Sequence, residues 1–345
     1  MRSAIIIVKD TSVFLVSFVI MTLDAKAYRV FFSVILEISE NLNTKESITM
    51  ERKPIFKGAA SAIITPMNEN GVDYESFRKL LNWQIEEGID ALVIAGTSGE
   101  GSTLTDEEHR EVLKFAVEVV GGRVPVIAGT GSNDTAYAID LTKYACEIGC
   151  DAMLVVTPYY NKATQKGLIK MFYAIADAST KPIILYNVPS RTGVNIEPAT
   201  YAELAKHPMI QAIKEANGQI DKITETMALC GDKLDLYSGN DDQIVPLMSV
   251  GGKGVISVLS NVLPKETSEM CHKFFSGDVK GAAEMQFKYF ALTKALFSEV
   301  NPIPVKAAMA AMGFGEDYVR LPLTVMEDAH KEVLLEEMRK VGLDV

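Results

Sequence analysis

The feature that most constrains the fold of this chain is a repeat of one local pattern. From Gly58 onward, a short apolar run is followed by a turn signal and then by about a dozen residues with helical periodicity. The apolar runs, such as ALVIA, AMLVV and PIILY, do not alternate with polar residues, which is typical of parallel strands covered by helices on both faces. Eight strands are predicted: Ala59–Ile64, Ala91–Ala95, Pro125–Gly129, Ala152–Val156, Ile183–Tyr186, Ile210–Lys214, Asp235–Ser238 and Gly254–Val258.

The segments between these strands have helical periodicity, and several of them open on an aspartate that could cap a helix. Eight such β/α units within about 200 residues predict an α/β fold, a (β/α)8 TIM barrel over residues 56–262. A doubly wound open sheet is the alternative, but Thr65–Asn68 is not the glycine-rich turn that usually follows its first strand. Residues 263–345 are expected to add a C-terminal helical region of three or so helices, with breaks at Asn301–Pro302 and Leu321–Pro322.

The first 49 residues differ in character from the rest of the chain. The apolar run Thr11–Leu23, with Ala25-Lys26-Ala27 after it, resembles a signal peptide. It is shorter than the roughly 20 residues that a membrane-spanning helix needs, so no membrane span is expected. Because Met50 opens a segment that begins like a complete domain, the favoured interpretation of residues 1–49 is an upstream extension or a misassigned start.

Composition excludes several classes of function. The net charge is -11 and no Lys/Arg block is present, so a nucleic-acid partner is not expected. The four cysteines form no CxxC pair and the four histidines are dispersed, so no metal site is expected. We interpret the cysteines as reduced thiols and expect a cytoplasmic protein.

In a TIM barrel the active site lies where the strands end. The predicted strands end on side chains that can carry chemistry, and all of these ends meet at one mouth. The candidate residues are Thr97, Ser98, Tyr160, Tyr186, Arg191, Lys214, Gly239 and Ile256.

Lys214 is the most reactive of these candidates. An amine held against apolar walls loses solvation, which favours the neutral, nucleophilic form that can condense with a carbonyl. The alternative is that Lys214 extends to solvent or pairs with Glu215. Imine formation needs a proton shuttle, for which Tyr186 is the candidate, although it could instead be a core tyrosine. Thr97 and Tyr160 are the available relay partners.

Two further features can bind anions. The turn at Thr97-Ser98-Gly99 is rich in hydrogen-bond donors and suits a small carboxylate, although such turns can be simple connectors. Arg191 carries a planar guanidinium that suits a second carboxylate. The sequence therefore offers two candidate sites for a carboxylate at the mouth that holds Lys214.

The motifs GTSGE, VTPYYN, YNVPSRTG, IKEANG and GVISV resemble, in order and spacing, those of the pyruvate-dependent class I aldolase family of dihydrodipicolinate synthase and N-acetylneuraminate lyase. The resemblance extends from about Phe56 to the C-terminus. The arginine of YNVPSRTG and the TPYY motif favour the synthase branch of this family.

The resemblance implies a reaction and roles for the candidates. Lys214 would form an imine with pyruvate, whose enamine would add to L-aspartate 4-semialdehyde and give 4-hydroxy-tetrahydrodipicolinate, the first committed step of lysine and diaminopimelate biosynthesis. Tyr186, Thr97 and Tyr160 would relay protons. In the family, the equivalent of Tyr160 reaches across from a neighbouring subunit, which implies at least a dimer. The usual assembly of the family is a tetramer, so the resemblance implies a homotetramer built from dimers that share Tyr160.

The remaining candidates would bind substrate. Thr97, Ser98 and the backbone of Ile256 would hold pyruvate, Arg191 would hold the carboxylate of the semialdehyde, and Gly239 would leave room at the mouth. No metal or organic cofactor is expected, because the imine itself is the electron sink.

The sequence departs from the family pattern in two places. Ser98 stands where many synthases have a second threonine, which keeps the hydroxyl. In the pocket where lysine inhibits some synthases, His109, Asn133 and Tyr159 match the pattern. Tyr137 replaces a glutamate there and Asp106 replaces a histidine, so weak or absent inhibition by lysine is expected.

Two alternative functions remain open at this point. One is another aldolase of the family, a lyase of N-acetylneuraminate or of a 2-keto-3-deoxy sugar acid. The other is a noncatalytic member that binds pyruvate-like ligands.

Overall fold

The computed structural model describes residues 2–9, 16–23 and 53–345. The chain divides into two units, Met1–Lys53 and Pro54–Val345. In the first unit, strand β1 (Arg2–Lys9) pairs antiparallel with β2 (Val16–Leu23). Part of the apolar run Thr11–Leu23 is thus strand β2. The other predictions for the N-terminal extension, including the cleavage-like Ala25-Lys26-Ala27, lie outside the described residues.

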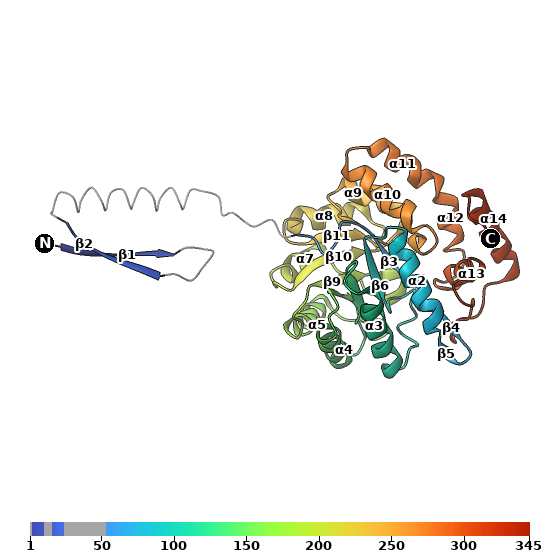
Figure 1. The fold of residues 1–345 in the computed structure, drawn as a ribbon, viewed down its shortest axis with the longest axis horizontal. Helices are drawn as coiled ribbons and strands as arrows, with labels where there is room; N and C mark the ends of the chain where they lie inside the picture. The colour runs from blue at the N-terminus through green and yellow to red at the C-terminus, as the bar shows by residue number, and fades with distance from the viewer. Residues whose placement is uncertain (1, 10–15, 24–52) are drawn as a thin grey trace. The chain divides into compact units, whose positions relative to one another are not determined.

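The second unit is built on eight parallel strands that close into a barrel (Figure 1). Neighbouring strands follow the order β10-β11-β12-β3-β6-β7-β8-β9, so β3 and β12 close the ring. The prediction of a TIM barrel is confirmed, and the doubly wound alternative is wrong. The strands are β3 (Gly58–Ala62), β6 (Ala91–Ile94), β7 (Val126–Gly129), β8 (Ala152–Val156), β9 (Ile183–Asn187), β10 (Ile210–Glu215), β11 (Asp235–Ser238) and β12 (Gly254–Ser257).

Helices connect successive strands on the outside of the barrel. Asp134 caps its helix as predicted, and Asp73 caps another. Asp106 instead lies one residue inside its helix, because Thr105 forms a capping box with Glu108. The helices of the barrel are α2 (Tyr74–Glu86), α3 (Asp106–Val120), α4 (Thr135–Glu147), α5 (Gln165–Asp177), α6 (Pro189–Thr192), α7 (Pro198–Leu204), α8 (Ile220–Cys230), α9 (Ile244–Ser249) and α10 (Pro264–Phe275).

Two kinds of short element complete the barrel unit. A small hairpin, β4 (Met67–Asn68) and β5 (Gly71–Val72), follows β3, and 3-10 turns lie at η1 (Asp241–Gln243) and η2 (Leu259–Asn261). They occupy the connections between a strand and the next helix, where the sequence predicts only turns.

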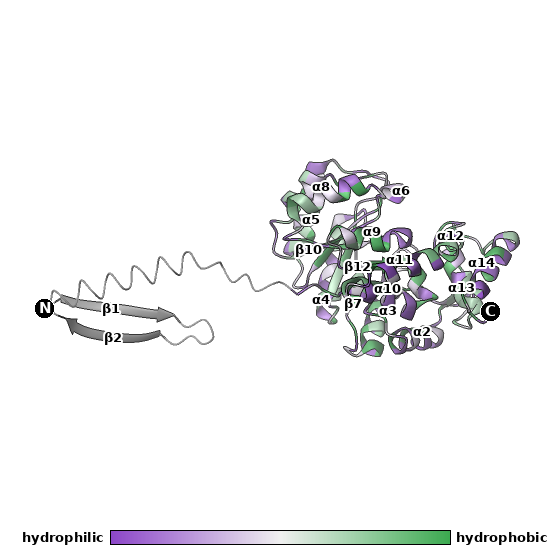
Figure 2. Cartoon of the chain, turned by 90° about the horizontal axis from the view of Figure 1, so that it is seen from above, coloured by the Kyte–Doolittle hydropathy of each residue, from purple (hydrophilic) through white to green (hydrophobic). Residues whose placement is uncertain are grey.

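The core has two layers because every strand buries both faces. Inside the barrel, a smaller cluster includes Val93, Ile184, Tyr186, Tyr237 and Ile256. A larger cluster fills the space between the strands and the helices. In Figure 2, helices such as α10 and α11 carry hydrophilic stretches, as expected for the outer layer of the barrel.

The C-terminal region contains more helices than expected. Residues 263–345 begin with α10, which packs against β3 as the last helix of the barrel. Four more helices follow: α11 (Val279–Lys288), α12 (Phe290–Ala295), α13 (Ile303–Ala311) and α14 (Asp328–Lys340). The predicted breaks at Asn301–Pro302 and Leu321–Pro322 are confirmed, and both peptide bonds are cis. Among the described residues, no helix is long and apolar enough to cross a membrane.

Candidate active site

The register of the sheet brings Lys214 and Tyr186 together at the carboxyl ends of adjacent strands. Lys214 on β10 pairs with Tyr186 on β9 on one side and with Tyr237 on β11 on the other. The Lys214 Nζ atom lies 4.3 Å from the centroid of the Tyr186 ring. The exposed fractions of Lys214 and Tyr186 are only 5% and 7%. The alternative in which Lys214 extends to solvent is therefore wrong.

Glu215 is not the partner of Lys214, because successive side chains on a strand point to opposite faces. Its carboxylate accepts hydrogen bonds from the Tyr201 hydroxyl at 2.8 Å, from Asn187 Nδ2 at 3.0 and 3.1 Å, and from the Asn217 amide at 2.9 Å. Burial raises the pKa of Glu215 to about 7, although these hydrogen bonds oppose the shift. The four residues join the ends of β9 and β10 on the side away from the barrel interior.

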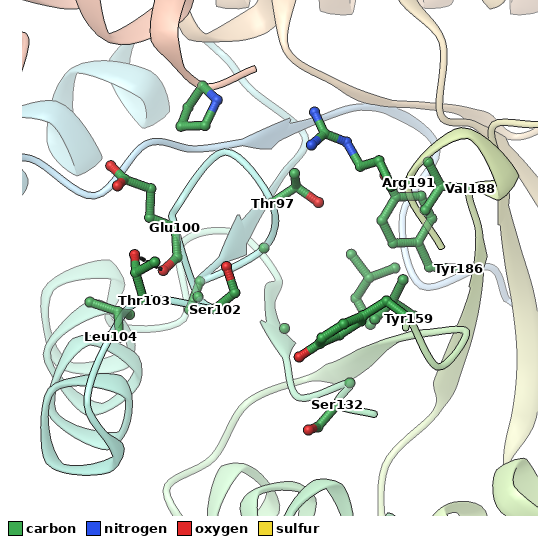
Figure 3. A pocket seen from close by; sticks show the side chains of 18 of the residues that line it. Thr97, Glu100, Ser102, Thr103, Leu104, Ser132, Tyr159, Tyr186, Val188 and Arg191 are labelled. Carbon is green, nitrogen blue, oxygen red and sulfur yellow. Dashed lines mark hydrogen bonds between the residues drawn. The ribbon is translucent and has the colours of Figure 1, made fainter. Parts of the chain in front are cut away.

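A cavity of about 580 Å³ opens at this mouth. Thr97, Tyr186 and Arg191 line it together with apolar side chains such as Leu154 and Val188. Figure 3 shows the side chains of Thr97 and Arg191 in the same region of the cavity, with the Tyr186 ring close to Arg191. Three of the predicted residues thus share one cavity, with Lys214 beside Tyr186 on the next strand.

Thr97 and Ser98 belong to the turn after β6. Ser98 is buried, and Asn301 Nδ2 donates a hydrogen bond of 3.0 Å to its Oγ. The backbone at Ala95 and Glu100 is left-handed, with φ of 54° and 52°. Such a conformation is unfavourable for a residue with a side chain and persists where the surrounding structure imposes it.

The C-terminal region supplies that support through Glu100. Its carboxylate accepts a hydrogen bond from Lys306 Nζ in a buried ion pair and another of 3.0 Å from the Arg320 amide. The Arg320 guanidinium in turn donates to the Thr103 carbonyl at 2.8 Å and binds the Glu108 carboxylate. The turn that carries Thr97 and Ser98 is thus fixed by residues that lie about 200 positions later in the chain.

Arg191 lies on α6, one turn after β9. Its Nη2 donates a 3.0 Å hydrogen bond to the backbone carbonyl of Asn301. A guanidinium has five N–H groups, so others remain for a ligand in the cavity that Arg191 lines. This arrangement can bind a carboxylate next to Tyr186.

Gly239 and Ile256 lie at the ends of β11 and β12. A Cβ atom on Gly239 would stand 2.8 Å from the Cβ of Ala216 and 3.1 Å from the carbonyl oxygen of Glu215. The glycine thus permits close packing against the residues that follow Lys214. Ile256 is buried in the barrel interior in the same cluster as Tyr186.

Tyr160 is not part of this constellation within one chain. Its side chain is 92% exposed and its backbone is left-handed, with φ of 72°. The preceding residue, Tyr159, lines the cavity instead (Figure 3). If Tyr160 contributes to catalysis, it must therefore do so at a site other than the cavity of its own chain.

Of the residues predicted for the pocket in which lysine inhibits some synthases, Asp106, His109, Tyr137 and Tyr159 line the same cavity, whereas Asn133 does not. The hydrogen bond with Arg110 lowers the pKa of the Asp106 carboxyl. Burial, and then the charge of Asp106, raises the pKa of Tyr137 to about 12. Both acids that line the cavity are therefore already engaged, Asp106 by Arg110 and Glu100 by Lys306.

Sequence reasoning missed the contributions of Asn301 and Lys306. The Asn301–Pro302 pair was interpreted only as a helix break. A signal for Lys306 was available, because it is the one charged residue in the otherwise apolar helix IPVKAAMAA. A lone charge on a buried helix needs a partner, but the sequence does not say which.

Comparisons with known proteins agree with this architecture. Residues 55–340 match the model of the dihydrodipicolinate synthetase family. The chain is 54% identical over 289 residues to a 4-hydroxy-tetrahydrodipicolinate synthase from Clostridium perfringens, which covers 84% of this chain and 99% of the relative. A dihydrodipicolinate synthase structure from Thermotoga maritima aligns with a TM-score of 0.82 and 42% identity, over 84% of this chain and 99% of that one. The structure of a monomeric dihydrodipicolinate synthase variant also aligns, with a TM-score of 0.82 and 43% identity. The alignment covers 84% of this chain and 98% of that variant.

Proposed function

Because the chain belongs to the dihydrodipicolinate synthetase family, we propose that Lys214 carries the reaction of that family in this protein. The protein is a lyase of the class I aldolase type that condenses pyruvate with L-aspartate 4-semialdehyde to 4-hydroxy-tetrahydrodipicolinate in lysine and diaminopimelate biosynthesis. The observation that supports the role of Lys214 is its burial beside Tyr186 at the mouth of the barrel.

The first half of the reaction forms an enamine. The amine of Lys214 adds to C2 of pyruvate, and Tyr186 delivers a proton to the oxygen, which leaves as water and gives the imine. Loss of a proton from the methyl carbon then gives the enamine. Thr97 lies in the same cavity as Tyr186 and is the relay partner within the chain.

The second half forms the ring. The enamine carbon adds to the aldehyde carbon of the semialdehyde, and the aldehyde oxygen takes up a proton to become the hydroxyl. The substrate amine then attacks C2 and displaces Lys214, which closes the ring and returns the free enzyme. Since the protonated imine takes up the electron pair when the methyl proton leaves, and the enamine returns it in the new carbon–carbon bond, we propose that no metal or organic cofactor takes part.

The two substrate carboxylates are assigned to different groups. Thr97, Ser98 and the backbone of Ile256 would hold pyruvate, while Arg191 would hold the semialdehyde. The location of Arg191 in the cavity beside Tyr186 supports this assignment. Gly239 would keep the ends of β10 and β11 close together.

The exposure of Tyr160 supports a shared site. A large aromatic side chain that is 92% exposed next to a cavity is available to a second copy of the chain. We propose a homotetramer of dimers in which Tyr160 completes the proton relay of a neighbouring subunit. Sedimentation equilibrium separates this assembly from a monomer, the state of one of the similar structures. Four free cysteines support a cytoplasmic location, where thiols stay reduced.

The central experiment traps the imine. Incubation with pyruvate and sodium borohydride should reduce the imine to a stable adduct on Lys214, identified by mass spectrometry of the peptide. Lys214→Arg keeps the charge and should give no adduct. Lys253, a lysine in the turn before β12, serves as the matched control, and Lys253→Arg should trap pyruvate like the wild type. Absence of an adduct in the wild type would refute the role of Lys214.

A second experiment distinguishes the substrates. Turnover with L-aspartate 4-semialdehyde and none with N-acetylmannosamine is expected. Arg191→Ala should raise the KM for the semialdehyde, because the substrate carboxylate loses a guanidinium partner. If the substrate were a sugar acid, Arg191→Ala would leave its turnover unchanged.

A further inference from the structure

Asn301 connects the two groups to which carboxylates are assigned above. It lies in the segment between α12 and α13, and its exposed fraction is 5%. Its side-chain amide contacts Ser98 and its backbone carbonyl accepts from Arg191. Asn301 also lines the cavity itself. One residue of the C-terminal region is therefore bonded to both anion-binding elements.

The contact with Ser98 determines where the serine proton points. A serine hydroxyl has one proton to donate and lone pairs to accept. Asn301 Nδ2 donates a 3.0 Å hydrogen bond to Ser98 Oγ, and the Ser98 hydroxyl donates a longer one of 3.4 Å to Oδ1 of the same amide. The shorter contact has the amide as the donor. Ser98 is the acceptor in that shorter contact, and its own proton has only to leave the longer 3.4 Å contact with Oδ1 to donate to an anion.

The opposite arrangement would disfavour an anion. If Ser98 donated to Asn301, only oxygen lone pairs would face a carboxylate bound at the turn. A hydrogen bond to a charged group contributes more than one between neutral groups, so the direction of this one proton matters for affinity.

Asn301 is held firmly enough to have this effect. Helix α13, which begins at Ile303, is attached to the turn of Ser98 by the buried ion pair of Lys306 with Glu100. Lys306 Nζ also donates a hydrogen bond of 2.8 Å to the Tyr318 carbonyl. The segment that carries Asn301 and the turn that carries Ser98 are thus joined by this ion pair as well as by the Asn301–Ser98 contact.

We propose that Asn301 is a positioning residue that orients the Ser98 hydroxyl toward the carboxylate of pyruvate. Its carbonyl also accepts a hydrogen bond from Arg191 and so holds that guanidinium in the lining of the cavity. The inference rests on the function proposed above and assigns a role to the C-terminal region in substrate selection.

The test measures pyruvate binding without the second substrate. The pyruvate concentration at half-maximal borohydride trapping is measured for wild type, N301A, S98A and the double variant N301A/S98A. N301A should raise this pyruvate concentration about tenfold, because the Ser98 hydroxyl is no longer directed toward the pyruvate carboxylate and a charge-assisted hydrogen bond is weakened. In the S98A background, N301A should add little, because Asn301 acts through that hydroxyl. Equal effects of N301A in both backgrounds would overturn the proposal.

Two further variants guard against indirect effects. N301D is nearly isosteric but cannot donate from its side chain, so it should weaken pyruvate binding more than N301A does. N70A changes an exposed asparagine in the β4–β5 turn and should behave like the wild type. If N301D binds pyruvate like the wild type while it remains folded by circular dichroism, the proposal is wrong.

The outcomes separate this proposal from the function. If the wild type traps pyruvate but does not turn over the semialdehyde, the proposed function fails and the trapping series still decides the role of Asn301. If the wild type traps no pyruvate, both are overturned. In steady state, N301A should change the KM for pyruvate more than the KM for the semialdehyde, because the backbone carbonyl that holds Arg191 is still present.

Discussion

Replacement of Lys306 by methionine tests how strongly the C-terminal region supports the site. The side chains of Lys306 and Glu100 have exposed fractions of 0% and 2%, so their ion pair is shielded from water. Lys306→Met preserves much of the volume but leaves the Glu100 carboxylate buried without its counter-charge. Removal of one partner from a buried pair costs about 3–5 kcal/mol.

This cost converts into a measurable change in melting temperature. The entropy of unfolding is about 2.1 cal/mol/K per residue, which for the roughly 290 residues of Pro54–Val345 amounts to about 0.6 kcal/mol/K. Lys306→Met should therefore lower Tm by about 5–8 °C. Thermal unfolding followed by circular dichroism at fixed protein concentration measures it, since the Tm of an oligomer depends on concentration.

Two controls make the result specific. The double variant K306M/E100Q removes both charges and should recover much of the lost stability, because the cost is that of an unpaired buried charge. Lys280→Met breaks an exposed pair with Glu284 and should change Tm by less than about 1 °C. The reasoning is refuted if Lys306→Met melts like the wild type or if the double variant melts as low as the single one.

Three other predictions concern the site. Tyr186→Phe should lower kcat by about 100-fold or more with little change in Tm, because a proton shuttle is lost while the ring packing stays; steady-state kinetics would contradict this if kcat fell less than tenfold. For Glu215, burial raises the folded-state pKa from 4.5 to about 7, so its protonation contributes stability below about pH 4.5 that is lost as the pH rises through 7. From pH 5 to pH 8, the free energy of unfolding of the wild type should fall relative to Glu215→Gln by up to about 3 kcal/mol; denaturant titrations at the two pH values that gave a constant difference would rule this out. Finally, sub-millimolar lysine should not inhibit turnover, since Tyr137 stands where a carboxylate would hold the effector amine; half-maximal inhibition in that range would show that Tyr137 is not decisive.

The local part of the fold could be predicted from the sequence because periodicity is a local property. Non-alternating apolar runs specified all eight strands to within two residues at each end, and the helical stretches between them imply parallel pairing. Once the sheet is parallel and closed, its carboxyl ends meet, so Lys214 and Tyr186 had to become neighbours. The resemblance to a family was carried by these same strand ends.

Contacts between distant segments could not be predicted in this way. Lys214 and Glu215 are adjacent in sequence, yet only the pleat and the position of α7 give Glu215 its partner Tyr201. Similarly, Tyr159 lines the cavity while Tyr160 lies exposed, which depends on one left-handed residue.

The sequence by itself thus determined the barrel and the residues at its mouth, because each strand and helix is specified by residues close together in the chain. Only the tertiary structure decided how the mouth is supported. Asn301 meets Arg191 across 110 positions, and Lys306 meets Glu100 across 206. Contacts of this kind leave no periodic signal, because they form only after the barrel has closed and the C-terminal helices have packed against it.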